Sequence, residues 1–378
     1  YNYAWLDLRA EPWVLTVPPI APEVRYYTSQ WNDMNGQVIG NVSALDDGHD
    51  GGDYLIAGPG WDGELPTGVR RVLRSETTIA VSLTRVESMG AGDLPGVRAI
   101  QEGFALAPLS SWLGTAAPTP ASTVEYPPYV EGTYQTGEDD FFDLMAFLLQ
   151  FSHPDAMDAP VLEHLRQIGI SPGTRWSTGF GSDPGQRTEA LAGLRDAREE
   201  IALIQTEKID LGPRAQFPLY GTREQLTTRY RHRAFGAWTG IFGNTPEQAA
   251  YRGWRADQHG DLADGSAHNY TVTLSAEDQA EVRFFWSVTI YELPTPFLYE
   301  NPQHRHAISA RKPDLIRDAD GSVTLYLQHE APPAEFEPNW LPVPAGHFIA
   351  ALRLYGPSVA IQNGTWAQPP LLVSAMSS

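Results

Sequence analysis

The sequence predicts a mainly β protein with a helical middle. Polar and apolar residues alternate in many short runs near both ends of the chain, as strands with one buried face require. Proline and glycine are frequent, with 31 and 34 residues, which favours turns and short strands. Between the two β-rich parts, apolar residues recur at the spacing of amphipathic helices.

Residues 1–113 contain short strand candidates that are separated by turns, which is typical of a β-sandwich. The turns are marked by Pro18-Pro19, by the acidic and glycine-rich residues 46–53 and by Gly58-Pro59-Gly60. The strand candidates are residues 13–17, 25–31, 54–57 and 78–83. A short helix is expected from Asp93 to Ala105, with Asp93 as its capping residue.

Residues 114–138 are rich in proline, threonine, alanine and glycine, and we expect a linker there. The range 139–267 is predicted to be the helical region. Its helix candidates are residues 140–151, 184–209 and 222–238. Thr245-Pro246-Glu247 is expected to begin a further helical turn, because proline is favoured at the first helical position.

Residues 268–378 again have the pattern of strands, and they form the last predicted domain. The strand candidates are residues 284–291, 322–328 and 348–355. Asp320-Gly321 is a hairpin signal before the second of them, and Gly356-Pro357 ends the third.

Composition limits the classes of function. A net charge of −20 repels phosphate backbones, so no nucleic-acid partner is expected. No apolar run reaches the roughly 18 residues that a membrane-spanning helix needs, so the chain is not expected to span a membrane. The absence of cysteine excludes disulfides, thiolate nucleophiles and cysteine-ligated metals. No phosphate-binding or dinucleotide-binding glycine loop precedes a helix, and no cofactor is predicted.

Several ordered strings in the sequence resemble two known families. The segments at residues 5–12, 25–27, 58–66 and 97–101 resemble the bacterial domain-of-unknown-function family numbered 1254. The segments at residues 285–291, 301–302, 320–322, 328–329, 339–342, 353–357 and 364–366 are similar to its usual partner, family 1214. The two resemblances together cover nearly the whole chain.

The resemblance implies an immunoglobulin-like β-sandwich followed by a helical segment and a jelly-roll β-sandwich. It also implies a periplasmic, envelope-associated or secreted protein. Members of the first family have a longer segment before the string that starts at Trp5, whereas Tyr1 lies only four residues before it. We therefore expect the first domain to be incomplete at its N-terminus.

Histidine and carboxylate residues are the first candidates for chemistry. Catalytic roles are predicted for His306, His329, Glu330, Arg305 and Asp33. His304 and His306 would share a face of a strand, and with His329 they could hold zinc or iron. No carboxylate follows His306 at the spacing of known metal sites, so the alternative is a polar loop around a structural Arg305, and no metal ligand is predicted.

Two further groups could bind a ligand. Trp340 and Trp31 could stack on a sugar or an organic ring, and Arg353 could anchor a carboxylate or sulfate; the alternatives are core packing and a structural ion pair. The acidic residues 46–53 could bind calcium, although their spacing fits no known calcium loop and an acidic hairpin tip explains them as well.

Together these features predict a hydrolase or lyase that acts on an organic or carbohydrate substrate in a cleft between the β domains. The alternative is a non-catalytic envelope protein that binds a ligand or assembles into homo-oligomers.

Overall fold

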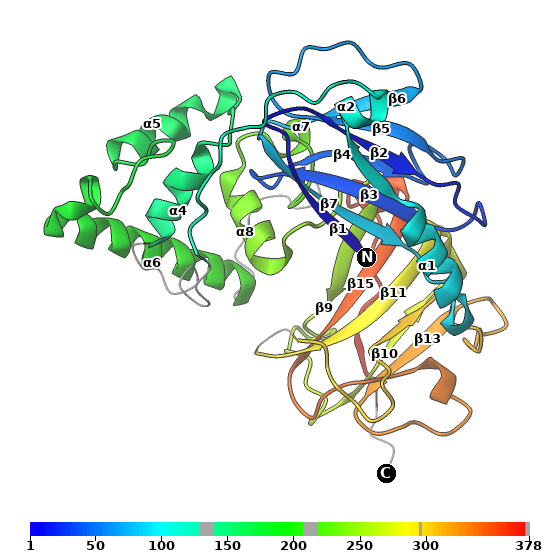
Figure 1. Cartoon of the computed structure of the whole chain (residues 1–378). Coiled ribbons are helices and arrows are strands. Elements are labelled where there is room, and N and C mark those ends of the chain that lie inside the picture. Colours follow the sequence, from blue (N-terminus) through cyan, green and yellow to red (C-terminus); the bar gives the residue numbers. More distant parts are fainter. Residues whose placement is uncertain (129–139, 207–217, 295–296, 375–378) are drawn as a thin grey trace. The chain divides into compact units, whose positions relative to one another are not determined.

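In a computed structural model that describes residues 1–128, 140–206, 218–294 and 297–374, the chain divides into two units (Figure 1). The first unit comprises residues 1–23, 27–86 and 98–243. The second comprises residues 24–26, 87–97 and those from 244 onward. The predicted fold class is confirmed, since both units are built on β-sheets and the helices concentrate in the middle of the chain.

The first unit contains two four-stranded sheets, with the strand orders β1-β7-β3-β4 and β6-β5-β2-β8. Their strands are β1 (Asn2–Asp7), β2 (Trp13–Val17), β3 (Tyr27–Asp33), β4 (Val38–Ser43), β5 (Gly52–Ala57), β6 (Val69–Arg74), β7 (Ile79–Val86) and β8 (Ala105–Pro108). All seven residues of β3 are buried, so this strand does not show the alternation of a half-exposed one.

Up to residue 243, the α-helices of the described chain are α1 (Leu94–Gly103), α2 (Leu109–Leu113), α4 (Asp140–Leu149), α5 (Ala159–Gln167), α6 (Pro184–Thr206), α7 (Arg223–Leu226) and α8 (Tyr230–Gly240). Helices lie in the predicted ranges 140–151, 184–209 and 222–238. In contrast, α5 is not among the predicted helices, and no helix begins at Thr245-Pro246-Glu247. Single 3₁₀ turns are η1 (Ala91–Asp93), η2 (Ala156–Asp158) and η3 (Phe180–Ser182). The helix expected over 222–238 is interrupted between α7 and α8, where Thr227 has a φ of 49°.

Helices α4 and α6 enclose a small core of their own. Phe142, Ala146, Ile170 and Trp176 are buried there, and Leu191 and Leu194 of α6 pack against them. The predicted linker 114–138 has no helix or strand from residue 115 to 128, and its remainder lies outside the described residues.

The second unit also contains two four-stranded sheets, ordered β14-β13-β10-β16 and β12-β11-β15-β9. Their strands are β9 (Ala249–Trp254), β10 (Asn269–Leu274), β11 (Val282–Glu292), β12 (Ala307–Ser309), β13 (Val323–Gln328), β14 (Trp340–Pro342), β15 (Phe348–Pro357) and β16 (Leu372–Ser374). Short helices α9 (Ala276–Ala280), η4 (Glu337–Asn339) and α10 (Val359–Gln362) lie between strands.

Strand β9 lies inside the range 139–267 that the sequence predicts to be helical. It pairs with β15 in antiparallel register, from Ala249 opposite Tyr355 to Trp254 opposite Ala350. Two alanines and a glycine give this segment a weak strand signal, so its pairing with β15 outweighs its local preference.

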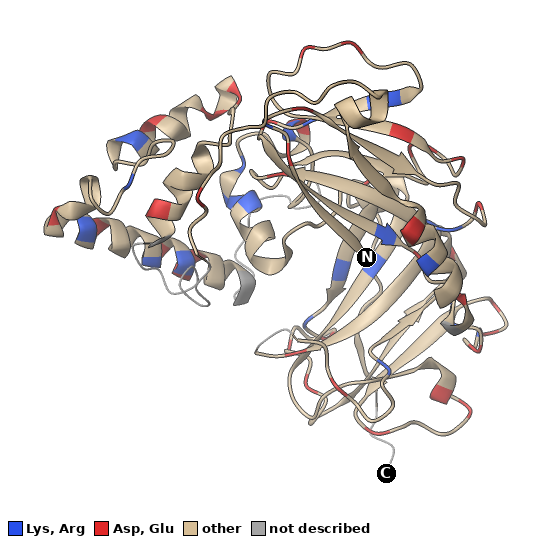
Figure 2. Ribbon diagram, viewed as in Figure 1, with Lys and Arg blue, Asp and Glu red and all other residues tan. Residues whose placement is uncertain are grey.

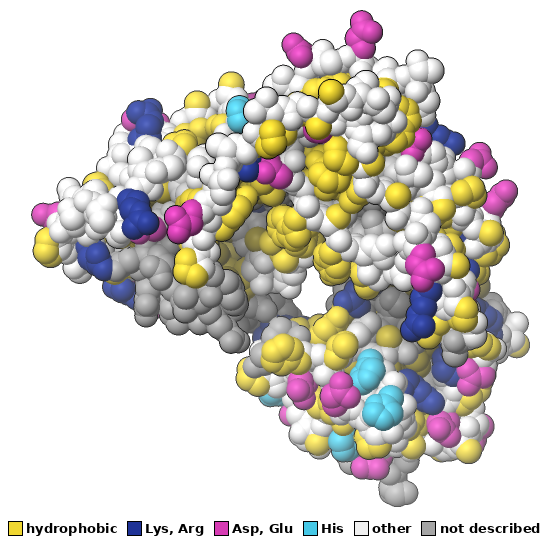
Figure 3. Space-filling view, in the orientation of Figure 1, with side chains coloured by type: hydrophobic (Ala, Val, Ile, Leu, Met, Phe, Trp, Pro, Cys, Tyr) yellow, Lys and Arg dark blue, Asp and Glu magenta, His cyan; other side chains and the backbone are white. Residues whose placement is uncertain are grey.

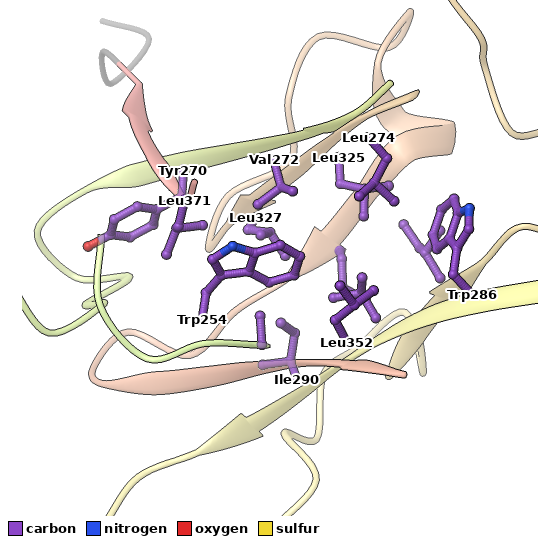
Figure 4. Close-up of a cluster of buried hydrophobic side chains, with 14 of the residues drawn as sticks. Trp254, Tyr270, Val272, Leu274, Trp286, Ile290, Leu325, Leu327, Leu352 and Leu371 are labelled. Atoms are coloured by element: carbon purple, nitrogen blue, oxygen red, sulfur yellow. The ribbon is translucent and has the colours of Figure 1, made fainter. Parts of the chain in front are cut away.

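The largest hydrophobic core lies between the two sheets of the second unit (Figure 4). Trp254, Tyr270, Trp286 and Leu352 are each at most 4% exposed. They come from strands of both sheets, which face each other as in a sandwich.

Acidic residues are distributed mainly over loops and helices of the described chain (Figure 2). None of the described helices is long and apolar enough to cross a membrane.

Candidate ligand-binding site

The sheet β12-β11-β15-β9 buries one face in the core and presents polar and aromatic side chains on the other, which we call the outer face. Leu352 and Leu354 of β15 belong to the core, so Arg353 between them points to the outer face. Arg353 lies opposite Ser287 of β11 and Tyr251 of β9. The outer face thus has a cation at the centre of three neighbouring strands.

The guanidinium group of Arg353 is held by neutral oxygens. Its Nη1 donates to Oγ1 of Thr289 at 2.9 Å, and its Nη2 donates to the hydroxyl of Tyr291 at 2.7 Å. The guanidinium carbon lies 5.7 Å from the centre of the Tyr291 ring. No aspartate or glutamate among the described residues pairs with it. Since arginine has five N–H donors, several remain for a ligand.

Aromatic side chains surround this cation. Tyr355 stacks on Phe285 with ring centres 4.1 Å apart and an angle of 17° between the planes. Tyr26 packs against Tyr355 at 5.0 Å. The ring of Tyr251 is 37% exposed, while its hydroxyl accepts a hydrogen bond from the backbone N of Asn244 at 3.0 Å. The tyrosine rings offer flat apolar surface beside the charged group.

This arrangement suits an oxyanion. A guanidinium fork binds a carboxylate through two parallel charge-assisted hydrogen bonds, which are about twice as strong as neutral ones. The alternative of a structural ion pair, which the sequence left open, has no carboxylate to complete it within the described part of the chain.

Asp33 lies in the first unit at the end of β3. It is 2% exposed; its Oδ1 accepts from the backbone N of Gln37 at 2.9 Å, and its Oδ2 has no partner. Burial raises the pKa of Asp33 to about 6, although the hydrogen bond from Gln37 acts in the opposite direction. Such a pKa would suit acid–base chemistry, but a carboxyl with 2% exposure has no open path to a substrate.

A network of charges lies near Asp33. Arg223 donates through Nε to Oε1 of Glu76 at 2.8 Å and through Nη2 to Oδ2 of Asp158 at 2.8 Å. The hydroxyl of Tyr230 donates to Oδ1 of Asp158 at 2.7 Å. These groups join α7 and α8 to the sandwich of the first unit, and each acid in the network is matched by a donor.

The structure places His306 and Arg305 in one loop but with different partners. Nδ1 of His306 lies 2.9 Å from the backbone oxygen of Tyr299. Nη1 of Arg305 donates to the backbone oxygens of Glu337 and Trp340, at 2.8 and 3.0 Å. Arg305 therefore has the structural role that the sequence held open, since it connects this loop to Glu337 and to the first residue of β14.

The other predicted site residues do not join these groups. Nδ1 of His329 lies 2.8 Å from the backbone oxygen of Val343, and its Nε2 lies 3.9 Å from the exposed Glu330. Trp340 and Trp31 are 3% and 0% exposed, so both are packing residues and neither offers an open face for stacking. The catalytic roles of His306, His329, Glu330, Arg305 and Asp33 stay predictions, as does the binding role of the tryptophans.

Carboxylates of the acidic residues 46–53 accept hydrogen bonds from other residues of the first unit. Oδ2 of Asp47 accepts from Nη2 of Arg71 and from the backbone N of Ser43, at 2.8 and 3.0 Å. Oδ1 of Asp53 accepts from the hydroxyl of Thr16 at 2.5 Å. The segment runs from β4 to β5, which belong to different sheets, so it is a connection between the two sheets and not the hairpin tip that the sequence left open.

Sequence reasoning missed the residues around Arg353, namely Tyr251, Thr289 and Tyr291. Two signals were present. Thr289 and Tyr291 are two residues apart on a predicted strand and therefore share a face. The aromatic Tyr251 was hidden because its segment did not have the appearance of a strand.

Comparison with known proteins identifies two regions of the chain. Residues 1–108 match the family described as "Protein of unknown function (DUF1254)", and residues 248–359 match "Protein of unknown function (DUF1214)". The chain is similar to the crystal structure of the VPA0106 protein from Vibrio parahaemolyticus, with a TM-score of 0.76, 28% identity, and coverage of 99% of this chain and 88% of that one.

A second solved structure, an uncharacterised protein from Burkholderia cenocepacia, has a TM-score of 0.43 and 12% identity over 98% of this chain and 75% of that one. No curated protein matches the chain. The family matches at residues 1–108 and 248–359 confirm the predicted pairing of the two families.

Proposed function

We propose that this chain, a member of the group of proteins that pair the DUF1254 and DUF1214 families, binds a small organic molecule that carries a carboxylate. The carboxylate pairs with Arg353 on the outer face, and the organic part packs on the tyrosine rings beside it. An acidic sugar and an aromatic acid both have this chemistry.

The observation that carries the proposal is the environment of Arg353. Its side chain is partly buried on a sheet, and two of its N–H groups donate to neutral hydroxyls. No aspartate or glutamate among the described residues neutralises its charge. Partial burial of a cation costs free energy unless it is paired. A ligand carboxylate would supply the missing charge, and partial exclusion of water would strengthen the contact.

Binding rather than catalysis is the function that the described residues support better. An enzyme of the hydrolase or lyase class needs an acid or base that reaches its substrate. Asp33, whose pKa is raised, is 2% exposed, and the outer face around Arg353 contains hydroxyls but no carboxylate partner among the described residues. Hydrolysis or elimination stays a prediction that no group on this face supports.

The test is a thermal-shift screen of organic acids, each compared with its uncharged amide. Acids are expected to raise the unfolding midpoint and amides are not, because a ligand stabilises the native state by mass action, by about 2.7 kcal/mol at one hundred times Kd. Arg353→Ala should abolish the shift, and Arg353→Lys should keep only part of it, because an ammonium lacks the planar fork.

The matched control is Arg283→Ala, which removes the same charge from an exposed position on β11. Arg283→Ala should respond to the acids like the unchanged protein. Equal shifts in the unchanged protein and in Arg353→Ala, or equal shifts with acids and amides, would contradict the proposal.

We also propose a periplasmic, envelope or secreted location, which the sequence resemblance supports, and self-association as a homo-oligomer. Fractionation of cells that produce the protein tests the location. Light scattering coupled to size-exclusion chromatography tests the association, and a monomer at all concentrations would contradict it.

A further inference from the structure

The loop before β12 brings two histidines and one glutamate together, at a place separate from Arg353. Ligand atoms of Glu300, His304 and His306 all lie within 4.8 Å of one another. Nε2 of His306 lies 3.9 Å from Oε2 of Glu300. Figure 3 shows histidine side chains on the surface of the second unit beside acidic ones.

Asn301 gives this loop a defined shape. It is 5% exposed; its Oδ1 accepts from the backbone N of Arg305 at 3.0 Å, and its Nδ2 donates to the backbone oxygens of Tyr299 and Arg305, at 3.3 and 3.1 Å. The backbone N of His304 donates to the oxygen of Asn301 at 2.9 Å, which closes the turn. A buried side chain with three backbone bonds thus holds the segment that carries the three candidate ligands.

His306 has the geometry of a metal ligand. Its Nδ1 lies 2.9 Å from the carbonyl oxygen of Tyr299, which can only accept, so Nδ1 carries the hydrogen. The lone pair is therefore on Nε2, the atom that faces Glu300. A backbone carbonyl that fixes the tautomer in this way is the usual support of a histidine bound to a metal.

His304 is held in an uncommon backbone conformation. Its φ is +50°, a region that few residues other than glycine occupy. Histidine adopts it more readily than most, and such conformations gather at functional sites, where the surrounding structure maintains them. Arg305, between the two histidines, donates to Glu337 and to the first residue of β14, so the loop is fixed on both sides of His304.

We propose that Glu300, His304 and His306 form a binding site for a divalent transition-metal ion such as Zn²⁺. Two imidazoles and one carboxylate are an established donor set for zinc and for iron, and such sites leave positions open for water. The donor atoms of one zinc ion, each about 2.0–2.2 Å from it, lie about 3–3.5 Å apart. The side chain of Glu300 is 80% exposed and free to turn toward the histidines.

The charge of the protein favours this binding. A net charge of −20 attracts cations to the whole molecule, and the only lysine near this loop in sequence, Lys312, pairs with Asp314 at 2.5 Å. No carboxylate follows His306 at the spacing of known metal sites, but Glu300 precedes the histidines and the turn at Asn301 brings it back beside them.

The test is a calorimetric titration of untagged, EDTA-treated protein with ZnCl₂. We expect one Zn²⁺ per chain with a Kd below about 10 μM. His304→Ala, His306→Ala and Glu300→Gln should each raise the Kd by at least about tenfold. Because Glu300 is exposed, Glu300→Gln should keep the metal-free unfolding midpoint.

His329→Ala is the matched control. Nε2 of His329 also lies 3.9 Å from a glutamate, but His329 does not belong to the cluster of Glu300, His304 and His306. It should bind Zn²⁺ like the unchanged protein. The proposal is overturned if the unchanged protein shows no stoichiometric binding, or if His329→Ala weakens binding as much as the variants of the three ligands do.

Discussion

Asp33 shows how one residue departs from its ordinary chemistry. It is a carboxyl at the end of a strand that is buried along its whole length, with one oxygen bonded to the backbone of Gln37 and the other without a partner. Its pKa is raised by burial from 3.8 to about 6. The folded state therefore binds this proton more tightly than the unfolded state does.

The stability that this protonated carboxyl contributes should be present below about pH 4 and lost as the pH rises through about 6. Asp33→Asn should consequently raise the free energy of unfolding at pH 8 by about 1–3 kcal/mol and change it little at pH 4. Urea unfolding at both pH values measures this difference.

Asp93 provides the contrasting control for that prediction. Its pKa is lowered, chiefly by the hydrogen bonds from Arg25, so its charged form favours folding. Asp93→Asn should destabilise the protein at pH 8 and less so in acid. An equal gain in stability from Asp33→Asn at pH 4 and pH 8 would show that burial does not shift the pKa of Asp33.

Strand β15 illustrates the scale of a single element. Its residues alternate between a buried side and a partly exposed side over its whole length, and the sequence alone predicts this strand almost to its ends. The same alternation places Arg353 on the outer face. In contrast, the single helix predicted over 222–238 is divided into two. Helix α7 ends before Thr227, which has a φ of 49°, and a second helix, α8, begins at Tyr230.

Substitutions on the two sides of β15 should differ in cost. Leu352 is 0% exposed in the core, and Leu352→Ala should lower the free energy of unfolding by about 2–5 kcal/mol through lost burial and a cavity. Ile349 lies on the outer side, and Ile349→Ala should cost about 1 kcal/mol or less. Urea midpoints measured with an unchanged m-value give both numbers, and equal costs would contradict the assignment of faces.

At the scale of the whole molecule, the second unit is assembled from distant parts of the chain. Glu87, whose side chain is 1% exposed, accepts from Nε of Arg311 and from the backbone N of Tyr26, both at 2.8 Å. Residues 24–26 and 87–97 thereby belong to the unit that otherwise starts at residue 244. Domain boundaries drawn along the sequence cannot describe this interleaving.

Glu87→Ala should therefore destabilise the protein by about 3–5 kcal/mol, because it leaves a charge and a backbone donor without their partner. The control is Asp314→Ala, which removes a 64% exposed carboxylate paired with Lys312 and should cost less than about 1 kcal/mol. Chemical unfolding compares the two variants, and similar costs would argue against a structural role for Glu87.

The sequence by itself determined the class of the fold, the family pairing, the main strands and helices, and the candidacy of Arg353, because these depend on local periodicity and on ordered strings of residues. Tertiary structure decided which side chains meet. Among the described residues, it left Arg353 without a carboxylate partner, brought Glu300 rather than His329 to His304 and His306, and buried Trp31 and Trp340. The physical reason is that such contacts depend on strand register and loop closure between distant segments, which no local pattern encodes.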